Sequence, residues 1–174
     1  GNVISGNGAH GILVQDGSDN EVRHNIIGLD SAGEADLGNA STGIRIADSA
    51  DNKVIGGNLI SGNEEAGVEL VGSTTTGNRL HDSEIGVKDG GVIARPNGGN
   101  GILVAQGASS NFIGTNGDGA DDSEEGNVIS GNALNGVMIT GSGTDDNKVA
   151  GNLIGTGAFG VTAVPNQQNG IIVQ

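Results

Sequence analysis

The sequence contains no Cys, Trp or Tyr, and only two Phe and two Pro among its 174 residues. Without Cys, disulfide scaffolds, thiol catalysis and Cys-ligated zinc are excluded. Two Pro are too few for collagen, which also needs Gly at every third position. No apolar run reaches the length of a membrane-spanning helix. With no Trp or Tyr, the chain has few aromatic groups with which to line a sugar-binding groove.

Basic residues are scarce too: seven Lys and Arg stand against 21 Asp and Glu, for a net charge of −14. This charge would repel a phosphate backbone, so nucleic acid is not an expected partner, whereas cations and basic surfaces are. Glycine, in contrast, supplies 35 residues. Because Gly is costly inside helices, this content disfavours a helical bundle. We expect residues 1–174 to form one domain that is a fragment of a longer protein.

The main signal in the sequence is a threefold motif that recurs six times. Each unit begins with Asn-apolar-Ile or a variant of it, at residues 2, 25, 58, 83, 127 and 152. A Gly-apolar-x-apolar segment follows, at 11–14, 43–46, 67–70, 101–104, 136–139 and 170–173. An Asn-x-apolar segment comes third, at 20–22, 52–54, 78–80, 111–113 and 147–149. Each unit therefore contains short apolar segments separated by Gly, Asn and Ser.

These segments alternate with period two, are rich in β-branched residues and are too short for helices, so they predict strands. A strand of three or four residues is not stable alone, but stacked units bury one continuous apolar column. We expect the column to contain Ile4, Ile12, Val14, Val22, Ile27, Ile44, Ile46, Val54, Ile60, Val68, Leu70, Leu80, Ile85, Ile102, Val104, Ile113, Ile129, Val137, Ile139, Val149, Ile154, Ile171 and Val173. The predicted fold is all-β, a solenoid of about six coils with three short strands each.

The run NVISGN…GILV resembles the right-handed parallel β-helix repeats of the pectate-lyase-like superfamily, and most of all those in large secreted or surface proteins of bacteria and archaea. The resemblance covers essentially the whole chain and concerns scaffold residues. The regularly placed Asn tolerate the left-handed backbone of sharp corners and can hydrogen-bond along the axis. The expected ladders are Asn2, Asn25, Asn58, Ser83, Asn127, Asn152 and Asn20, Asn52, Asn78, Asn111, Asn147.

Units two, four and six carry long insertions before the Gly-apolar motif, at Gly28–Thr42, Gly86–Asn100 and Gly155–Asn169. We expect these loops to project from one corner on alternate coils. They would form either the wall of a binding groove or a lid over the apolar residues that follow the first ladder, which are Val3, Ile26, Leu59, Val128 and Leu153.

A further insertion, at 115–126, is strongly acidic and Gly-rich. Hard oxygen ligands in such a loop suit Ca²⁺. The candidate calcium ligands are Asp118, Asp121, Asp122, Glu124 and Glu125. The pattern matches a calcium loop only in part, since Ala120 stands where a ligand is expected, and a solvated acidic loop is the alternative.

Two outward-facing columns follow from the repeat. One contains Leu13, Arg45, Glu69, Leu103, Met138 and Ile172, in which Arg45 and Glu69 are expected to pair on neighbouring coils. The other contains Glu21, Lys53, Arg79, Phe112 and Lys148 and has much of the scarce positive charge. The candidate ligand-binding residues are Arg45, Lys53, Arg79, Phe112 and Lys148.

Enzymes with this type of fold act mostly on acidic polysaccharides. The motifs that the resemblance implies for polygalacturonase-like and epimerase-like enzymes are absent or only hinted at, as in Ala9-His10-Gly11. We therefore expect a non-catalytic extracellular or cell-surface segment that acts as a rigid spacer, an adhesive rod or a glycan-contacting scaffold. The alternative is a polysaccharide lyase or glycoside hydrolase acting on acidic polysaccharide. The expected partners are a polysaccharide or another surface, and further copies of the chain, end to end or side by side.

Overall fold

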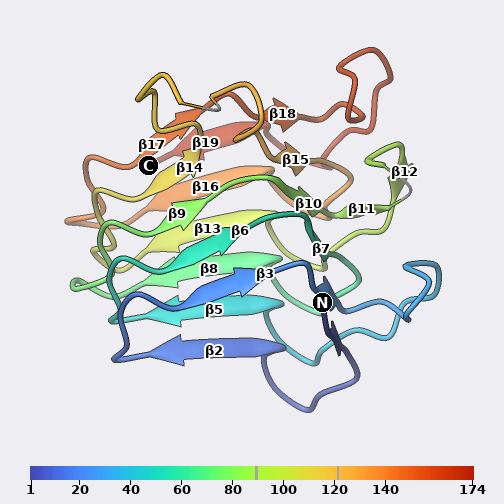
Figure 1. Cartoon of the computed structure of the whole chain (residues 1–174), viewed down its shortest axis with the longest axis horizontal. Coiled ribbons are helices and arrows are strands. Elements are labelled where there is room, and N and C mark those ends of the chain that lie inside the picture. The colour runs from blue at the N-terminus through green and yellow to red at the C-terminus, as the bar shows by residue number, and fades with distance from the viewer. Residues whose placement is uncertain (89, 121) are drawn as a thin grey trace.

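The computed structural model describes residues 1–88, 90–120 and 122–174 and shows three parallel sheets that wrap around one apolar core (Figure 1). The first sheet contains β1 (Val3–Ile4), β4 (Ile26–Ile27), β7 (Asn58–Ile60), β10 (Ser83–Ile85), β15 (Val128–Ile129) and β18 (Leu153–Ile154). The second contains β2 (Ile12–Gln15), β5 (Ile44–Ala47), β8 (Val68–Val71), β13 (Ile102–Ala105), β16 (Val137–Thr140) and β19 (Ile171–Val173). The third contains β3 (Glu21–Arg23), β6 (Lys53–Ile55), β9 (Arg79–Leu80), β14 (Phe112–Gly114) and β17 (Lys148–Ala150).

The chain visits the three sheets in turn and so forms a parallel β-helix, as the repeat predicted. The predicted register is confirmed, because every unit pairs with the same motif of the next one. Ile12, for example, pairs with Ile44, and Ile44 pairs with Val68. None of the described residues forms a helix that could cross a membrane.

The core is the predicted aliphatic column, and most of its members in the middle coils are fully buried. The prediction is wrong for the last strand, where Ile171 is 47% exposed and Val173 is 71% exposed. Both lie on β19, which is the edge strand of the second sheet, so one side of these residues has no neighbouring strand. The half-buried state of Ile4, Ile12, Val14 and Val22 has the same cause at the opposite edge.

The Gly that opens each strand of the second sheet is required by close contact between coils. A Cβ atom placed on Gly11, Gly43, Gly67, Gly101 or Gly136 would lie 2.5–2.7 Å from the carbonyl oxygen of the equivalent Gly in the next coil. Contacts that short do not occur, so any side chain here would push the coils apart. The repeated Gly is therefore a packing residue.

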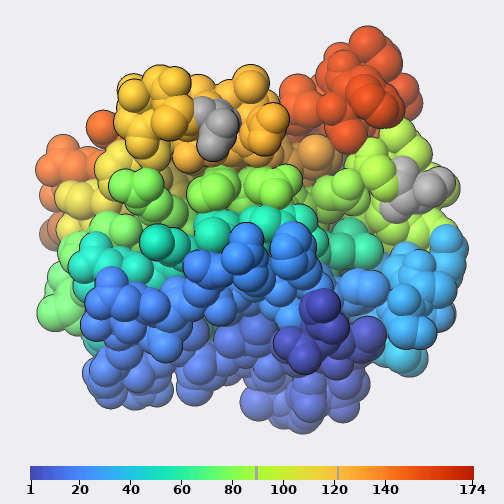
Figure 2. Space-filling model, viewed as in Figure 1, coloured from blue at the N-terminus to red at the C-terminus, as the bar shows by residue number. Residues whose placement is uncertain are grey.

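The three predicted insertions form equivalent hairpins that project from one side of the molecule (Figures 1 and 2). Each closes with the same backbone hydrogen bond, donated by Leu37 N to Gly28 O, by Arg95 N to Gly86 O and by Val164 N to Gly155 O. The second hairpin contains the antiparallel pair β11 (Val87–Lys88) and β12 (Ile93–Ala94). Because each hairpin closes on itself, the regular coil resumes after it.

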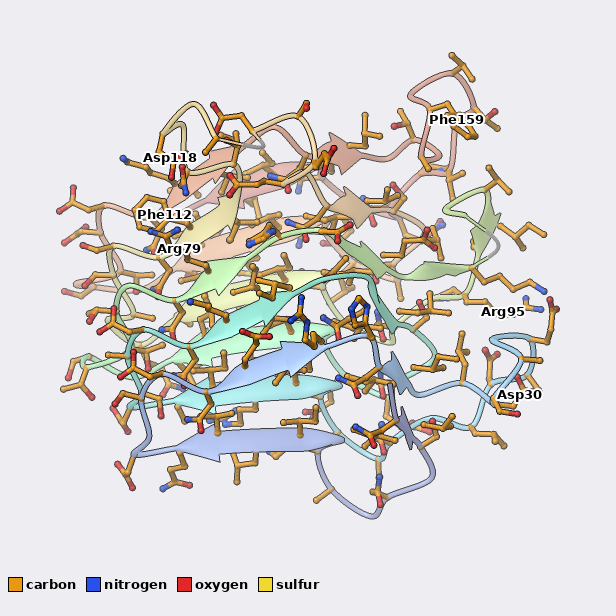
Figure 3. The ribbon with its side chains drawn as sticks, in the orientation of Figure 1. Asp30, Arg79, Arg95, Phe112, Asp118 and Phe159 are labelled. Carbon is orange, nitrogen blue, oxygen red and sulfur yellow. The ribbon has the colours of Figure 1, made fainter. Side chains whose placement is uncertain are left out.

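The second and third hairpins cover Val128 and Leu153, two of the five apolar residues that the lid alternative named, whereas Val3 is 49% exposed. Val87 and Val164 pack with Val128 of the first sheet, with Leu153 and Ala158 against them. The first and second hairpins are joined by ion pairs, since Lys88 pairs with Glu34 and Arg95 Nε lies 3.9 Å from Asp36. The tip of the third hairpin stays bare, with Phe159 82% exposed and Val161 85% exposed (Figure 3).

Candidate functional site

Asparagine ladders set the position of every corner of the coil. In the ladder that starts at Asn2, the Asn2 side-chain amide donates to Asn25 Oδ1 at 2.9 Å, and Asn25 donates to Asn58 Oδ1 at 3.2 Å. The predicted ladder that starts at Asn20 has the same geometry. In both, the Oδ1 atom of each Asn faces the preceding coil.

The sequence analysis missed two further ladders. One contains Asn7, Asn39, Asn63, Asn97, Asn132 and Asn166. Its signal is the Asn that closes Ser-Gly-Asn at Asn7, Asn63 and Asn132, whereas in the coils with hairpins the equivalent Asn comes after the hairpin and follows Gly38, Pro96 or Pro165. The other contains Asn100, Asn135 and Asn169 and runs in the opposite direction. Except for Asn7 and Asn169 on the terminal coils, these Asn are buried, and all are hydrogen-bonded along their ladders, so they belong to the scaffold.

The predicted cationic column lies on the outer face of the third sheet. Strand register places Glu21 beside Lys53, Lys53 beside Arg79, Arg79 beside Phe112, and Phe112 beside Lys148. Phe112 is half-buried between two cations, with Arg79 Cζ at 5.7 Å and Lys148 Nζ at 5.1 Å from the ring centroid. Cation–π attraction at these distances orders the three side chains on the surface.

The cations of this column remain accessible. Lys53, Arg79 and Lys148 are exposed, and within the described residues none of them forms an ion pair. Two shallow hollows lie along the column. One, of 320 Å³, is lined by Asp19, Asp51, Lys53, Gly77 and Arg79, and the other, of 560 Å³, by Ser110, Phe112, Asp146, Asn147 and Lys148. We call Lys53, Arg79, Phe112 and Lys148 the cationic column.

Arg45, the fifth predicted ligand-binding residue, is not part of this column. It lies on β5 in the second sheet and pairs with Glu69 on β8, as the sequence predicted for those two residues. Glu69 is 9% exposed, so the guanidinium of Arg45 is committed to a buried carboxylate. The structure therefore brings together four of the five predicted residues.

The acidic loop arches over the end of the third sheet, with Asp118 close to Arg79 and Phe112 (Figure 3). The carboxylates of Asp118, Asp122 and Glu125 accept hydrogen bonds within the loop. Asp122 Oδ1 accepts from Thr115 Oγ1 at 2.6 Å, and Glu125 Oε2 accepts from Asn116 N at 3.0 Å. The Ala120 N–H holds the pKa of Asp118 below its ordinary value, and the Asn116 side chain and the Arg79 charge lower it further.

The calcium site stays a prediction. Glu124 and Glu125 line a hollow of 220 Å³ with Arg23, His81 and Asp82. Asp121 lies outside the described residues. Within the part of the chain that the structure describes, no three His, Cys, Asp or Glu side chains form a group that could hold a metal ion.

Comparisons with curated proteins and with solved structures give no match. A family model described as "Periplasmic copper-binding protein (NosD)" matches residues 1–91, which is more than half of the chain. The matched segment spans the first three coils and the first two strands of the fourth, including the first hairpin and its contact with Lys88. On this match and on the right-handed parallel β-helix that the family shares, the chain belongs to the NosD family.

Proposed function

We propose that this chain is a rigid, non-catalytic scaffold outside the cytoplasm, and that its cationic column binds acidic glycans. The location is supported by the word periplasmic in the family description. Rigidity is supported by the ladders, which tie each coil to the next through buried side-chain amides. A spacer or adhesive role follows from the same stiffness.

The observation that carries the glycan proposal is the alignment of three accessible cations and one aromatic ring along the third sheet. Of seven basic side chains, three lie in the cationic column, about one strand spacing of 4.8 Å or a small multiple of it apart. A polymer with a carboxylate on each sugar can meet successive cations, and its sugar faces can contact Phe112. Asp19, Asp51 and Asp146, which lie at left-handed corners beside the column, can accept hydrogen bonds from sugar hydroxyls.

Copper, which the family description names, has no part in this proposal. Copper prefers imidazole and thioether ligands. His10 precedes β2, His24 follows β3 and His81 follows β9, and within the described residues they join no group of three metal-binding side chains. Met138 lies on β16 in the second sheet, where its sulfur accepts from the Asn100 side-chain amide at 3.7 Å. The described residues therefore do not fit a copper site.

The test is calorimetric titration with polygalacturonate and with neutral dextran. We expect binding of polygalacturonate only, weakening as salt is added because exposed charges are screened. The double variant Arg79→Gln and Lys148→Gln should bind at least about tenfold more weakly, because two charge-assisted contacts are lost. Arg95→Gln is the matched control, since Arg95 lies on a hairpin on the other side of the molecule (Figure 3). Equal loss in the control would show that only net charge matters.

The same samples distinguish the scaffold from the enzyme that the sequence left as the alternative. Release of unsaturated or reducing sugar ends from polygalacturonate, with or without Ca²⁺, would favour the lyase or hydrolase. We expect binding without product release.

A further inference from the structure

The chain contains six Asn-Gly pairs, and the structure holds one of them differently from the others. The Asn residues of these pairs are Asn7, Asn97, Asn100, Asn116, Asn135 and Asn169. Because Gly has no side chain to obstruct it, its backbone nitrogen can attack the side-chain amide carbon of the preceding Asn. All except Asn116 belong to ladders, which hydrogen-bond their side chains between coils. Asn116 lies in the acidic loop, where Gly117 is exposed.

The backbone N–H that follows the ladder Asn is also held between coils in the interior of the solenoid. Gly98 N donates to Asn63 O, Gly101 N to Asn135 O and Gly136 N to Asn169 O. A nitrogen that is fixed in this way cannot swing toward the side chain before it. The fold therefore protects the ladder pairs from this reaction.

In the acidic loop, the N–H of Gly117 is connected to a carboxylate through a hydroxyl group. Gly117 N donates to Thr115 Oγ1 at 3.1 Å, and Thr115 Oγ1 donates to Asp122 Oδ1 at 2.6 Å. The other oxygen of this carboxylate, Oδ2, accepts from Gly119 N at 3.1 Å, which fixes its orientation. A hydroxyl both accepts and donates a hydrogen bond, so Thr115 can pass a proton from the nitrogen to Asp122. Loss of that proton is what makes the nitrogen nucleophilic.

The side-chain amide of Asn116 is polarised at the same place. Its Oδ1 accepts from Asp118 N at 2.7 Å, and its Nδ2 donates to Asp118 Oδ2 at 2.9 Å. A backbone N–H on the carbonyl oxygen stabilises the negative charge that develops there when the amide carbon becomes tetrahedral, as an oxyanion hole does. A Cβ atom placed on Gly117 would meet no atom within 4 Å, so water can reach the reacting groups.

We propose that Asn116 is a self-deamidation site whose reaction is promoted by its own loop. Gly117 N forms a bond to Asn116 Cγ while its proton passes through Thr115 Oγ1 to Asp122. The Cγ–Nδ2 bond then breaks, and Nδ2 regains a proton through water and leaves as ammonia, so that a cyclic imide remains. Water opens this imide and gives a carboxylate, as aspartate or as isoaspartate. The net reaction consumes one water molecule, releases one ammonia molecule and needs no other reactant.

The aspartate product alters the surroundings of Asp118. A carboxylate then stands where the Asn116 amide donated a hydrogen bond. That bond is one cause of the lowered pKa of Asp118, so its loss and the new like charge raise the pKa of Asp118. Deamidation therefore adds one negative charge to the loop and removes one of its internal hydrogen bonds.

The test is peptide mapping by mass spectrometry after incubation of the full chain at mildly alkaline pH, in buffer and in concentrated urea. In urea the six Asn-Gly pairs should react at similar rates, because the fold no longer distinguishes them. In buffer Asn116 should react faster than it does in urea, whereas Asn97, Asn100 and Asn135 should react more slowly. A rate at Asn116 that is lower in the folded chain than in urea would overturn the proposal.

Variants of the loop separate the proton relay from a merely structural role. Asp122→Asn and Thr115→Val break the relay and should slow deamidation of the folded chain by at least about tenfold, the lower end of what a positioned base supplies. Thr115→Ser keeps the hydroxyl and should keep the rate. Glu124→Gln removes an equal charge from an exposed position of the same loop and is the matched control. A structural role predicts the opposite sign, because a loosened loop would expose Asn116 and speed the reaction. Unchanged or faster deamidation in Asp122→Asn would therefore overturn the proposal.

Discussion

Replacing Ser83 with Asn should stabilise the protein, although most substitutions at buried positions do the opposite. Ser83 is 5% exposed and stands at a position where the five other coils of the same sheet have Asn in hydrogen-bonded contact. An Asn at this position can donate to Asn127 Oδ1, which is without a partner. The substitution therefore supplies one side-chain amide to a ladder that is already built to receive it.

The size of the gain follows from the cost of the unsatisfied acceptor. Leaving a buried acceptor without a donor costs about 1–3 kcal/mol, and a typical new hydrogen bond contributes about 0.5–1.5 kcal/mol net. We expect a gain of about 2 kcal/mol in the free energy of unfolding. For a chain of this length, that raises the melting temperature by roughly 4–8 °C.

Thermal melting followed by circular dichroism measures the effect, and Ser18→Asn is the control, because Ser18 is exposed and contacts no ladder. A double-mutant cycle with Asn127→Ala isolates the ladder, since the gain from Ser83→Asn should vanish without its acceptor. An unchanged or lower melting temperature for Ser83→Asn, or a gain that persists without Asn127, would refute the reasoning.

Three further predictions follow from contacts described above. Gly67→Ala should cost roughly 1–3 kcal/mol in a denaturant titration, because its Cβ would lie 2.6 Å from Ile85 Cγ2, whereas Gly8→Ala, with no atom within 4 Å, should be neutral. Glu34→Gln should lower the melting temperature of the protein more than Lys88→Met does. Glu34→Gln leaves the Lys88 ammonium, whose side chain is 8% exposed, without its partner, whereas Lys88→Met leaves the Glu34 carboxylate, whose side chain is 60% exposed and can be solvated. Equal melting temperatures would contradict this. Carboxyl NMR should show Asp118 titrating below its ordinary pKa of 3.8, so its contribution to loop stability is present above pH 3.8 and is lost as the pH falls through the lowered pKa. Arg79→Gln should raise the pKa of Asp118 only in part, because the hydrogen bond from the Ala120 N–H is the largest cause of its lowering.

The sequence was sufficient to predict the strands, the register and the outward columns. One motif repeated six times fixes which residue lies above which, so the pairing of Arg45 with Glu69 and the position of Phe112 between Arg79 and Lys148 follow from alignment of the units alone. Arg45 was also named as a candidate ligand-binding residue, although the repeat places it in the other outward column, where its guanidinium pairs with Glu69.

Other features depend on how irregular segments fold. The ladder through Asn39 and Asn97 escaped notice because a hairpin separates each of these Asn from the strand before it. Only the closing hydrogen bonds, such as Leu37 N to Gly28 O, show that the hairpin returns the chain to the same corner. A cavity lined by Ser83 depends on the third hairpin, whose Ala158 contributes to its wall, and no local pattern foretells that contact.

The self-closing hairpins also have a geometric consequence. They arise on the second, fourth and sixth coils, so their bases are two strand spacings, roughly 10 Å, apart along the axis. Since each hairpin closes through an equivalent pair of backbone groups, its tip can change in length without altering the spacing of the coils. The molecule thus presents evenly spaced attachment points, and the exposed tip of the third hairpin, at Phe159 and Val161, can be changed without breaking the ion pairs that join the first two hairpins.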